Sequence, residues 1–322
     1  MKQYFVMMIG LSGSGKSFRA KQLCKDKSWK IISSDSIREE EFGNINDQTH
    51  NEEVFNLMRK RTCFYLEKGN SVVYDATNVT IKDRKTILDL VNKIKKDKAQ
   101  IIIQAYVMRT PFLECLKRNI LRDRTVPIPV IKKQRTRFQT PLLNEGFDKI
   151  ILDGYIEKNT YNKNALSYFQ EQMKDFDQQT HYHKYDLLTH QKETYRYYCE
   201  HRCTFVEVCS AFGVLLHDYG KLFTKTKNDK GEYSYYNHAN VGSYELLSYL
   251  ECLGLGCLPN ALQFLYLINY HMLMFDLEKA STKKIEKYKK LFGERLWIEL
   301  ELLHNSDKKA SKGKEEKHEK AD

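Results

Sequence analysis

Short apolar runs alternate with amphipathic stretches through the first half of the chain. The apolar runs, each bounded by polar residues or glycine, cover residues 4–9, 29–33, 71–75, 101–107 and 149–152. Runs of this length between turn signals are typical of buried strands. Residues 51–68, 81–96 and 111–121 instead place apolar side chains at helical spacing. Strands that alternate with helices predict an α/β domain with a doubly wound parallel sheet over residues 1–157.

The pattern changes in the second half of the chain. Residues 158–180 are mostly polar, and we predict that they form a linker. Residues 181–310 show one helical pattern after another with few strand signals, which predicts an all-α domain. Residues 311–322 are rich in Lys and Glu, and we expect them to form a disordered charged tail.

A glycine-rich motif follows the first predicted strand. Gly10 to Ser17 fit G-x-x-x-x-G-K-S, and a helical pattern comes next, which is the context of a phosphate-binding P-loop. The alternative, a Gly/Ser turn that binds nothing, is disfavoured by this context. Backbone N–H groups and the helix N-terminus would hold phosphate oxygens, Lys16 would reach the β- and γ-phosphates, and Ser17 would hold Mg²⁺. The sequence therefore predicts ATP and Mg²⁺ as ligands, bound by Gly10, Ser12, Gly13, Ser14, Gly15, Lys16 and Ser17.

Charged residues follow the second and third predicted strands, where open α/β sheets handle their ligands. Asp35 is placed to accept a proton from an attacking hydroxyl, although it could instead be a helix N-cap. Arg38 lies three residues on, within reach of an acceptor phosphate. Asp75 ends the third strand and could support Mg²⁺ or the acceptor. Phosphoryl transfer needs this combination of base, positive charge and metal.

Residues 122–137 are dense in Arg, Lys and Pro, which predicts a mobile basic lid. Arg118, Arg122 and Arg124 could clamp the transferring phosphates as this lid closes, with Arg118 and Arg122 on one helical face. Taken singly, each of these arginines could equally be a solvated charge. We include Arg122 among the catalytic candidates and Arg124 among the nucleotide-binding ones.

These segments resemble one known family. Residues 33–38 (SSDSIR), 75–78 (DATN) with Arg84, 122–127 (RDRTVP) and 144–148 (NEGFD) look like the 5′-hydroxyl polynucleotide kinases, over about residues 1–155. The resemblance implies a P-loop kinase fold in which Asp35 activates the 5′-hydroxyl group. It also implies that Arg38 holds the phosphate of the acceptor and that the lid arginines grip the donor.

Histidine and aspartate residues recur through the helical half. His217 and Asp218 are adjacent, and His190, His238, His271 and Asp307 are the other candidate ligands. Imidazole and carboxylate together suit Mn, Fe, Co, Ni or Zn, and such metals can acidify a water or clamp a phosphate. A single histidine on a helix is more often a packing or surface residue, so the prediction depends on the whole set.

That set resembles the HD phosphohydrolase superfamily, over about residues 181–310. The resemblance implies a first metal held by His190, His217, Asp218 and Asp307. It implies a second metal held by His238 and His271, and a phosphate contact from Lys221. With all these ligand types present, we expect two divalent transition-metal ions.

Composition narrows the choice of partner. The chain of 322 residues has a formal net charge of +11, which favours a polyanion such as nucleic acid, although solubility and a basic tail could also explain it. Its 8 cysteines include no C-x-x-C pair, so we expect free thiols. Without a signal peptide or an apolar run of membrane length, we predict a cytoplasmic protein with no membrane partner.

Two phosphate-handling sites in one basic chain predict a bifunctional enzyme that heals nucleic-acid ends. The kinase would phosphorylate 5′-hydroxyl ends of RNA or DNA, with RNA favoured. The HD domain would hydrolyse 2′,3′-cyclic, 2′- or 3′-phosphate ends. Two alternatives remain: a small-molecule or nucleotide kinase fused to an HD nucleotide phosphohydrolase, and a regulatory module that binds ATP without transferring phosphate.

Overall fold

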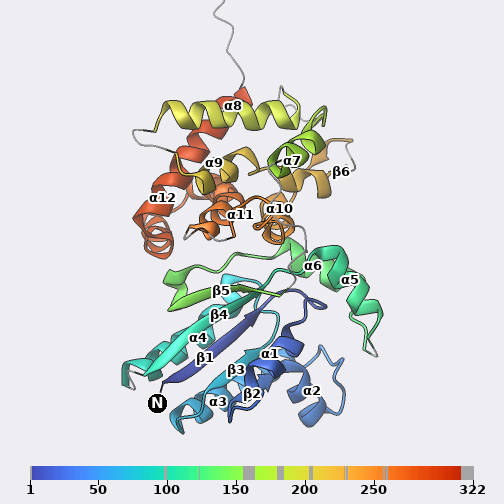
Figure 1. Cartoon of the computed structure of the whole chain (residues 1–322), viewed down its shortest axis with the longest axis vertical. Helices are drawn as coiled ribbons and strands as arrows, with labels where there is room; N and C mark the ends of the chain where they lie inside the picture. Colours follow the sequence, from blue (N-terminus) through green and yellow to red (C-terminus); the bar gives the residue numbers. More distant parts are fainter. Residues whose placement is uncertain are drawn as a thin grey trace, which may run out of the picture. The chain divides into compact units, whose positions relative to one another are not determined.

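The computed structural model describes residues 2–97, 100–122, 124–154, 164–179, 185–202, 206–227, 229, 231–256, 258 and 260–312. The chain divides into two compact units, Met1–Ile156 and Glu157–Asp322, which are treated separately below (Figure 1).

The first unit is built on a parallel sheet of five strands in the order β2-β3-β1-β4-β5. The strands are β1 (Gln3–Ile9), β2 (Lys30–Ser33), β3 (Val72–Asp75), β4 (Ile101–Met108) and β5 (Lys149–Asp153). Strands β3 and β4 pair with opposite edges of β1, so the strand order changes direction at β1. The loop after β1 therefore lies at a switch point of the strand order, where α/β sheets bind ligands.

Helices cover both faces of this sheet. They are α1 (Lys16–Cys24), α2 (Ser34–Phe42), α3 (Asn51–Glu67), α4 (Ile81–Asp97), α5 (Phe112–Ile120) and α6 (Ile128–Thr136), with a short 3₁₀ helix η1 (Leu143–Glu145). On one face, Val6 and Met8 of β1 pack with Ala20 of α1. Phe5 and Met7 alternate with them, so they point to the other face, and they are also fully buried. Burial on both faces explains why residues 4–9, which form most of β1, read as a continuous apolar run.

The second unit is helical. Its elements are α7 (Ala165–Met173), α8 (Leu187–Glu200), α9 (Val208–Leu215), η2 (Tyr219–Phe223), α10 (His238–Leu247), α11 (Ala261–Leu277) and α12 (Thr282–Lys312), with a small antiparallel pair β6 (Thr226–Lys227) and β7 (Tyr233–Ser234). Gly293 interrupts α12 with φ 76° and ψ 161°, so the helix stops and starts again there. The predicted order, a parallel-sheet α/β domain followed by a helical region, is confirmed.

Two predicted segments differ in the structure. Residues 158–180, expected to be a linker, contain α7, whose Ala165, Phe169 and Met173 are buried. Phe169 makes edge-to-face ring contacts with Tyr219 and Tyr249, so this helix packs within the second unit. Three apolar positions four residues apart mark only one helical face, which is too short a signal to stand out in polar surroundings. The expected lid, residues 122–137, contains helix α6.

Other predictions lie outside the described residues. The expected tail, residues 311–322, is described only as far as Lys312, where α12 ends. Six cysteines within the described residues form no disulfide bond: Cys24, Cys63, Cys115, Cys199, Cys209 and Cys252. Among the helices of this part of the chain, none combines the length and the apolar character needed to cross a bilayer.

Candidate active sites

The loop between β1 and α1 has the conformation that a phosphate cradle needs. Gly13 has φ 86°, and a Cβ atom there would lie 2.2 Å from the carbonyl oxygen of Cys115. Gly15 has φ 93° and is the last residue before α1. The left-handed backbone favours glycine at both positions, and at Gly13 the carbonyl of Cys115 also leaves no space for a side chain.

Lys16 and Asp75 face each other at the base of this loop. Lys16 is buried, and its Nζ donates to the carbonyl oxygen of Leu11 at 2.8 Å. Burial lowers the pKa of Lys16, and the nearby Asp75 carboxylate opposes that shift. Burial raises the pKa of Asp75, while Lys16 and a hydrogen bond from Ser17 oppose it. The Ser17 hydroxyl and the Asp75 carboxylate together are the oxygen donors that Mg²⁺ prefers, so these residues fit the predicted ion.

Helix α6 contacts the loop through one side chain. The Ser12 amide donates to Oε1 of Gln134 at 2.8 Å, and Nε2 of Gln134 donates to the Ser12 hydroxyl at 3.1 Å. The carbonyl oxygen of Ser14 accepts from the Thr110 hydroxyl at 2.8 Å. Gln134 lies 122 residues from Ser12 in sequence, and sequence analysis missed it because no local pattern indicates such a contact.

Asp35 lies in the first turn of α2, beside the same loop. The N-cap of this helix is Ser33, whose hydroxyl accepts from the amide of Asp35 at 3.3 Å, so the alternative of Asp35 as the N-cap is wrong. The Asp35 carboxylate lies 2.6 Å from Nη1 of Arg124 and 3.5 Å from Nη1 of Arg38. It also interacts electrostatically with Lys16. The carboxylate is 46% exposed, which leaves room for an incoming hydroxyl.

Arg38 is held by the loop between α2 and α3. Its Nε donates to the carbonyl oxygen of Asp47 at 2.8 Å, and its Nη2 donates to Oδ1 of Asn51 at 2.7 Å. Only 5% of the residue is exposed. The two hydrogen bonds therefore fix the Arg38 side chain beside the Asp35 carboxylate. Burial lowers the pKa of Arg38, and Asp35 opposes the shift.

The three candidate lid arginines occupy different places. Arg124 pairs with Asp35, and its Nε donates to Oδ1 of Asn46 at 2.8 Å, whereas we had expected it to bind the donor. Arg122 is exposed and interacts electrostatically with Lys16. Nη1 of Arg118 lies 3.6 Å from the Cβ position at Gly15. Two of these arginines therefore lie near the phosphate loop, and the third pairs with Asp35.

The segment at residues 75–78 and Arg84 form a buried clamp. Arg84 donates through Nε and Nη2 to the two oxygens of Glu145, at 2.6 and 2.8 Å. Its Nη1 donates to the carbonyl oxygens of Asn78 and Gln139, both at 3.0 Å. Asn78 in turn donates to the carbonyl oxygen of Met8 in β1 at 2.7 Å. These contacts fix the loop that follows Asp75 and hold three distant segments together.

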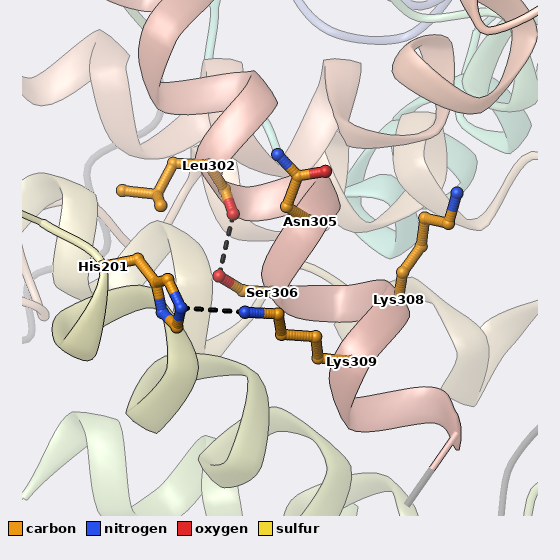
Figure 2. A pocket seen from close by; sticks show the side chains of 6 residues that line it. All are labelled: His201, Leu302, Asn305, Ser306, Lys308 and Lys309. Carbon is orange, nitrogen blue, oxygen red and sulfur yellow. Dashed lines mark hydrogen bonds between the residues drawn. The ribbon is translucent and has the colours of Figure 1, made fainter.

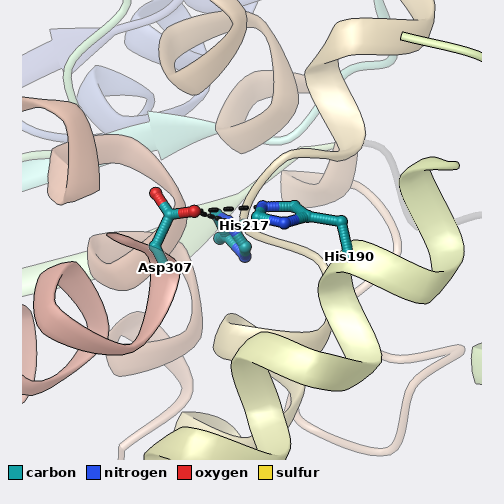
Figure 3. Close-up of side chains that lie close together, drawn as sticks. All are labelled: His190, His217 and Asp307. Atoms are coloured by element: carbon teal, nitrogen blue, oxygen red, sulfur yellow. Dashed lines mark ion pairs between the residues drawn. The ribbon is translucent and has the colours of Figure 1, made fainter. Parts of the chain in front are cut away.

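In the second unit, the predicted metal ligands converge from separate elements (Figure 3). Ligand atoms of His190, His217 and Asp307 lie within 4.8 Å of one another, as do those of His217, Asp218 and His271. His190 comes from α8, His271 from α11 and Asp307 from α12, and all are buried. His217 and Asp218 lie between α9 and η2. The fold thus gathers side chains that are far apart in the sequence.

Asp218 lies between two pairs of imidazoles. Its Oδ1 is 2.9 Å from Nε2 of His238 and 3.4 Å from Nε2 of His271. Its Oδ2 is 3.5 Å from Nε2 of both His190 and His217. Nε2 of His190 also lies 3.0 Å from Oδ1 of Asp307. One carboxylate therefore faces both pairs, which is the placement expected of a bridging ligand.

The tautomers of these rings suit a metal. Nδ1 of His217, His238 and His271 each lies 2.8–2.9 Å from the carbonyl oxygen three residues before it, so each donates its proton there. The Nε2 atoms then carry lone pairs. Those of His238 and His271 face each other at 3.1 Å, and Nε2 of His217 is buried without a hydrogen-bond partner among the described residues. Facing lone pairs repel unless a cation lies between them, so the residues fit a metal of the kind predicted.

The electrostatics of the cluster depend on burial. Burial lowers the pKa of His217 to about 4. Burial also acts against protonation of His190, but hydrogen bonds with Asp218 and Asp307 raise its pKa to about 9. The pKa of Asp218 stays well below its ordinary value despite burial, because Lys221 and the histidines surround it. The carboxylates are therefore ionised and able to bind cations.

Lys221 also belongs to this cluster. Its Nζ lies 2.6 Å from Oδ2 of Asp218 and donates to Oε1 of Gln178 at 2.8 Å. Only 4% of Lys221 is exposed. The backbone carbonyl of Gln178 accepts from the Tyr235 hydroxyl at 2.6 Å. Sequence analysis missed Gln178, because it lies in the segment that we predicted to be a linker.

A separate pocket of about 400 Å³ lies between the end of α8 and the last turns of α12 (Figure 2). Nζ of Lys309 lies 2.8 Å from Nε2 of His201 across it, and the Ser306 hydroxyl donates to the carbonyl oxygen of Leu302 at 2.8 Å. The pocket contains none of the predicted site residues. Lys308 at its edge pairs with Glu278 at 2.6 Å.

The first unit is a P-loop kinase-like α/β domain, and this fold supports the interpretation of the chain as a phosphotransferase enzyme. A family model described as an AAA domain matches residues 5–141. No curated protein matches the chain.

Solved structures with similarity to the chain include three that involve a kinase or RNA repair. One is from a Pnkp1/Rnl/Hen1 RNA repair complex, at 20% identity and a TM-score of 0.35, covering 42% of this chain and 44% of that one. Another is a putative kinase from Chloroflexus aurantiacus, at 13% identity and a TM-score of 0.38, covering 48% and 86%. A third is the Mycobacterium tuberculosis APS kinase CysC with AMPPNP and APS, at 21% identity and a TM-score of 0.33, covering 47% and 88%. The chain thus spans less than half of the RNA repair protein that it matches.

Proposed function

We propose that this chain is a bifunctional enzyme that heals nucleic-acid ends. Residues 1–157 would transfer the γ-phosphate of ATP to 5′-hydroxyl ends, and residues 181–310 would hydrolyse 2′,3′-cyclic, 2′- or 3′-phosphate ends. One observation supports both halves: each unit gathers a separate set of charged side chains of the kind that handles phosphate. In the first, Asp35 lies between Arg38 and Arg124 beside the phosphate loop. In the second, histidines and carboxylates surround Asp218.

The first site has the groups that phosphoryl transfer requires. Asp35, which lies between two guanidinium groups, takes the proton of the 5′-hydroxyl as the hydroxyl oxygen forms a bond to the γ-phosphorus. The bond from that phosphorus to the β–γ bridging oxygen breaks, and ADP leaves. Lys16 and Arg122, which both interact electrostatically with Asp75, neutralise charge on the donor. Mg²⁺ held by Ser17 and Asp75 would supply further charge neutralisation.

The second site is suited to hydrolysis. His190, His217, Asp218 and Asp307 would hold one divalent metal, and His238 and His271, with Asp218 between, would hold a second. Such metals supply an acidified water and a clamp for phosphate oxygens. Lys221 places a positive charge 2.6 Å from Asp218, where it can attract the phosphate of a substrate. The histidine Nδ1 bonds to backbone fix the rings before any ligand arrives.

Nucleic acid is the partner that the charge favours. The formal net charge of +11 attracts polyanions, and RNA ends are the favoured substrate because cyclic phosphates arise only with a 2′-hydroxyl. The similarity to a chain of an RNA repair complex is compatible with this proposal but does not carry it.

The proposal is tested with defined ends. The protein is incubated with ATP, Mg²⁺ and 5′-hydroxyl oligonucleotides of RNA and DNA, and in parallel with oligonucleotides that end in a 2′,3′-cyclic phosphate, under a series of divalent metals. Lys16→Ala should abolish label transfer and spare hydrolysis, and Asp218→Ala should do the reverse. Transfer to small hydroxyl compounds but not to oligonucleotides would contradict the end-healing proposal.

A further inference from the structure

Two aromatic rings stack beside the loop between α2 and α3, the loop that also holds Arg38. Phe42 is the last residue of α2, and His50 is the residue before α3. Their ring centroids lie 4.3 Å apart with an interplanar angle of 10°. The stack joins the ends of two helices, so its position depends on both of them.

The His50 ring is fixed from its edge as well as from its face. Its Nδ1 lies 2.5 Å from Oδ2 of Asp47. Asp47 is itself held, because its Oδ1 accepts from the amide and the hydroxyl of Thr49 at 2.7 and 2.6 Å. The His50 side chain is 47% exposed, whereas that of Asp47 is 12% exposed. The result is a flat ring that is anchored on one side and open to solvent.

The same short loop holds the groups around Asp35. The backbone carbonyl of Asp47 accepts from Nε of Arg38, whose Nη1 lies 3.5 Å from the Asp35 carboxylate. Asn46, the neighbouring residue, accepts from Arg124, which also pairs with Asp35. Asp47 thus contacts Arg38 through its backbone carbonyl and the His50 ring through its carboxylate.

We propose that His50, backed by Phe42, is a stacking platform for a nucleobase near the 5′ end of the acceptor strand. This inference rests on the proposed kinase function and adds to it a residue that selects polynucleotides. An aromatic ring in a fixed plane recognises any base through its π-face, and two guanidinium groups nearby suit the phosphates of the same strand. A sugar has no flat aromatic face to bind there.

The test pairs a substrate change with a protein change. Acceptors are a 5′-hydroxyl oligonucleotide and two versions of it with an abasic residue at the first or the second nucleotide. Enzymes are the full chain and its His50→Ala, His50→Phe and Phe64→Ala variants. Phe64 is a matched control, since it is an exposed ring on the same α3 helix, about 20 Å further along. The readouts are kcat/KM for each acceptor and KM for ATP.

Stacking of one base should favour the intact acceptor over one of the abasic acceptors by about 5- to 150-fold in the unchanged protein. His50→Ala should remove this preference without further slowing that abasic acceptor. His50→Phe should restore most of it, and Phe64→Ala should leave it intact. KM for ATP should stay the same throughout.

Three results would overturn the inference. Equal slowing of intact and abasic acceptors by His50→Ala would indicate a structural role only. A rise in KM for ATP would place the adenine of the donor on the ring. No preference for the intact acceptor in the unchanged protein would exclude stacking, whereas a lack of transfer to every oligonucleotide would instead reject the kinase proposal.

Discussion

The buried pair of Arg84 and Glu145 makes a prediction that can be worked out from its contacts. The side chains of Arg84 and Glu145 are 0% and 3% exposed, and two charge-assisted hydrogen bonds join them. In Glu145→Ala, the guanidinium keeps its bonds to the carbonyl oxygens of Asn78 and Gln139 but loses the Glu145 carboxylate, and the amide of Leu142 loses the Glu145 oxygen that accepts from it. Leaving a buried charge without its partner costs about 3–5 kcal/mol. A domain of this size is stable by about 5–15 kcal/mol, so the change removes a large share.

The matched control removes both charges. In the double variant Arg84→Met with Glu145→Leu, the buried charge is removed together with its partner. The further loss is the two bonds from the Arg84 guanidinium to the carbonyl oxygens of Asn78 and Gln139, worth about 1.5 kcal/mol each. The double variant should therefore be more stable than Glu145→Ala alone. If Glu145 stabilised the fold only by filling space, the double variant would not be more stable than the single variant.

The assay uses the positions of the tryptophans. The chain has 2 Trp residues, of which Trp29 lies in the first unit and Trp297 in the second. In a Trp297→Phe background, fluorescence during urea unfolding follows Trp29, which stacks on Tyr4 in the sheet. Glu145→Ala should lower the unfolding midpoint by roughly 2 M urea. A shift under about 0.5 M, or a double variant less stable than the single one, would refute the reasoning.

Three further predictions concern the two sites. Gly13→Ala should abolish ATP binding in a calorimetric titration, because its Cβ would meet a backbone carbonyl, whereas Gly43→Ala, with φ 63° and open space around it, should bind ATP normally. Arg124→Ala should lower kcat for phosphoryl transfer with little change in KM for ATP, because Arg124 pairs with Asp35. Arg122→Ala should instead raise KM for ATP, because Arg122 interacts electrostatically with Lys16. The reverse pattern would indicate that Arg124 binds ATP. Saturating Mn²⁺ or Zn²⁺ should raise the melting temperature of the second unit, because metal at 100 times its Kd adds about 2.7 kcal/mol of stability. Chelation of the metal, or the change Asp307→Asn, should remove most of that gain. An unchanged melting temperature would show that the cluster holds no metal.

Much of the first unit could be predicted because its signals are local. A continuous apolar run such as residues 4–9 specifies a buried strand, and the structure forms β1 there, with Phe5 to Ile9 fully buried. The glycine motif likewise carries its own geometry, since positive φ angles and close backbone contacts admit little else. Asp35 could be singled out because it follows a strand directly.

Other features depend on contacts that no local pattern encodes. Gln134 reaches the phosphate loop from another helix, and its type and spacing resemble those of any exposed polar residue. Arg124 could be recognised as a candidate, but its partner Asp35 depends on how the chain folds back after α5. Gln178 was hidden in polar surroundings beside a short helix. In each case the residue type was visible in the sequence, while the partner became known only from the three-dimensional arrangement.

The break at Gly293 has a consequence for how the chain can vary. Asp307 lies in the part of α12 that begins after this glycine, so its direction is set by the residues between them. One inserted residue within that stretch would rotate Asp307 by about 100° around the helix axis and carry its carboxylate away from His190. An insertion before Gly293 imposes no such rotation, because the interruption can absorb it. Insertions and deletions should therefore be tolerated before Gly293 but not between Gly293 and Asp307.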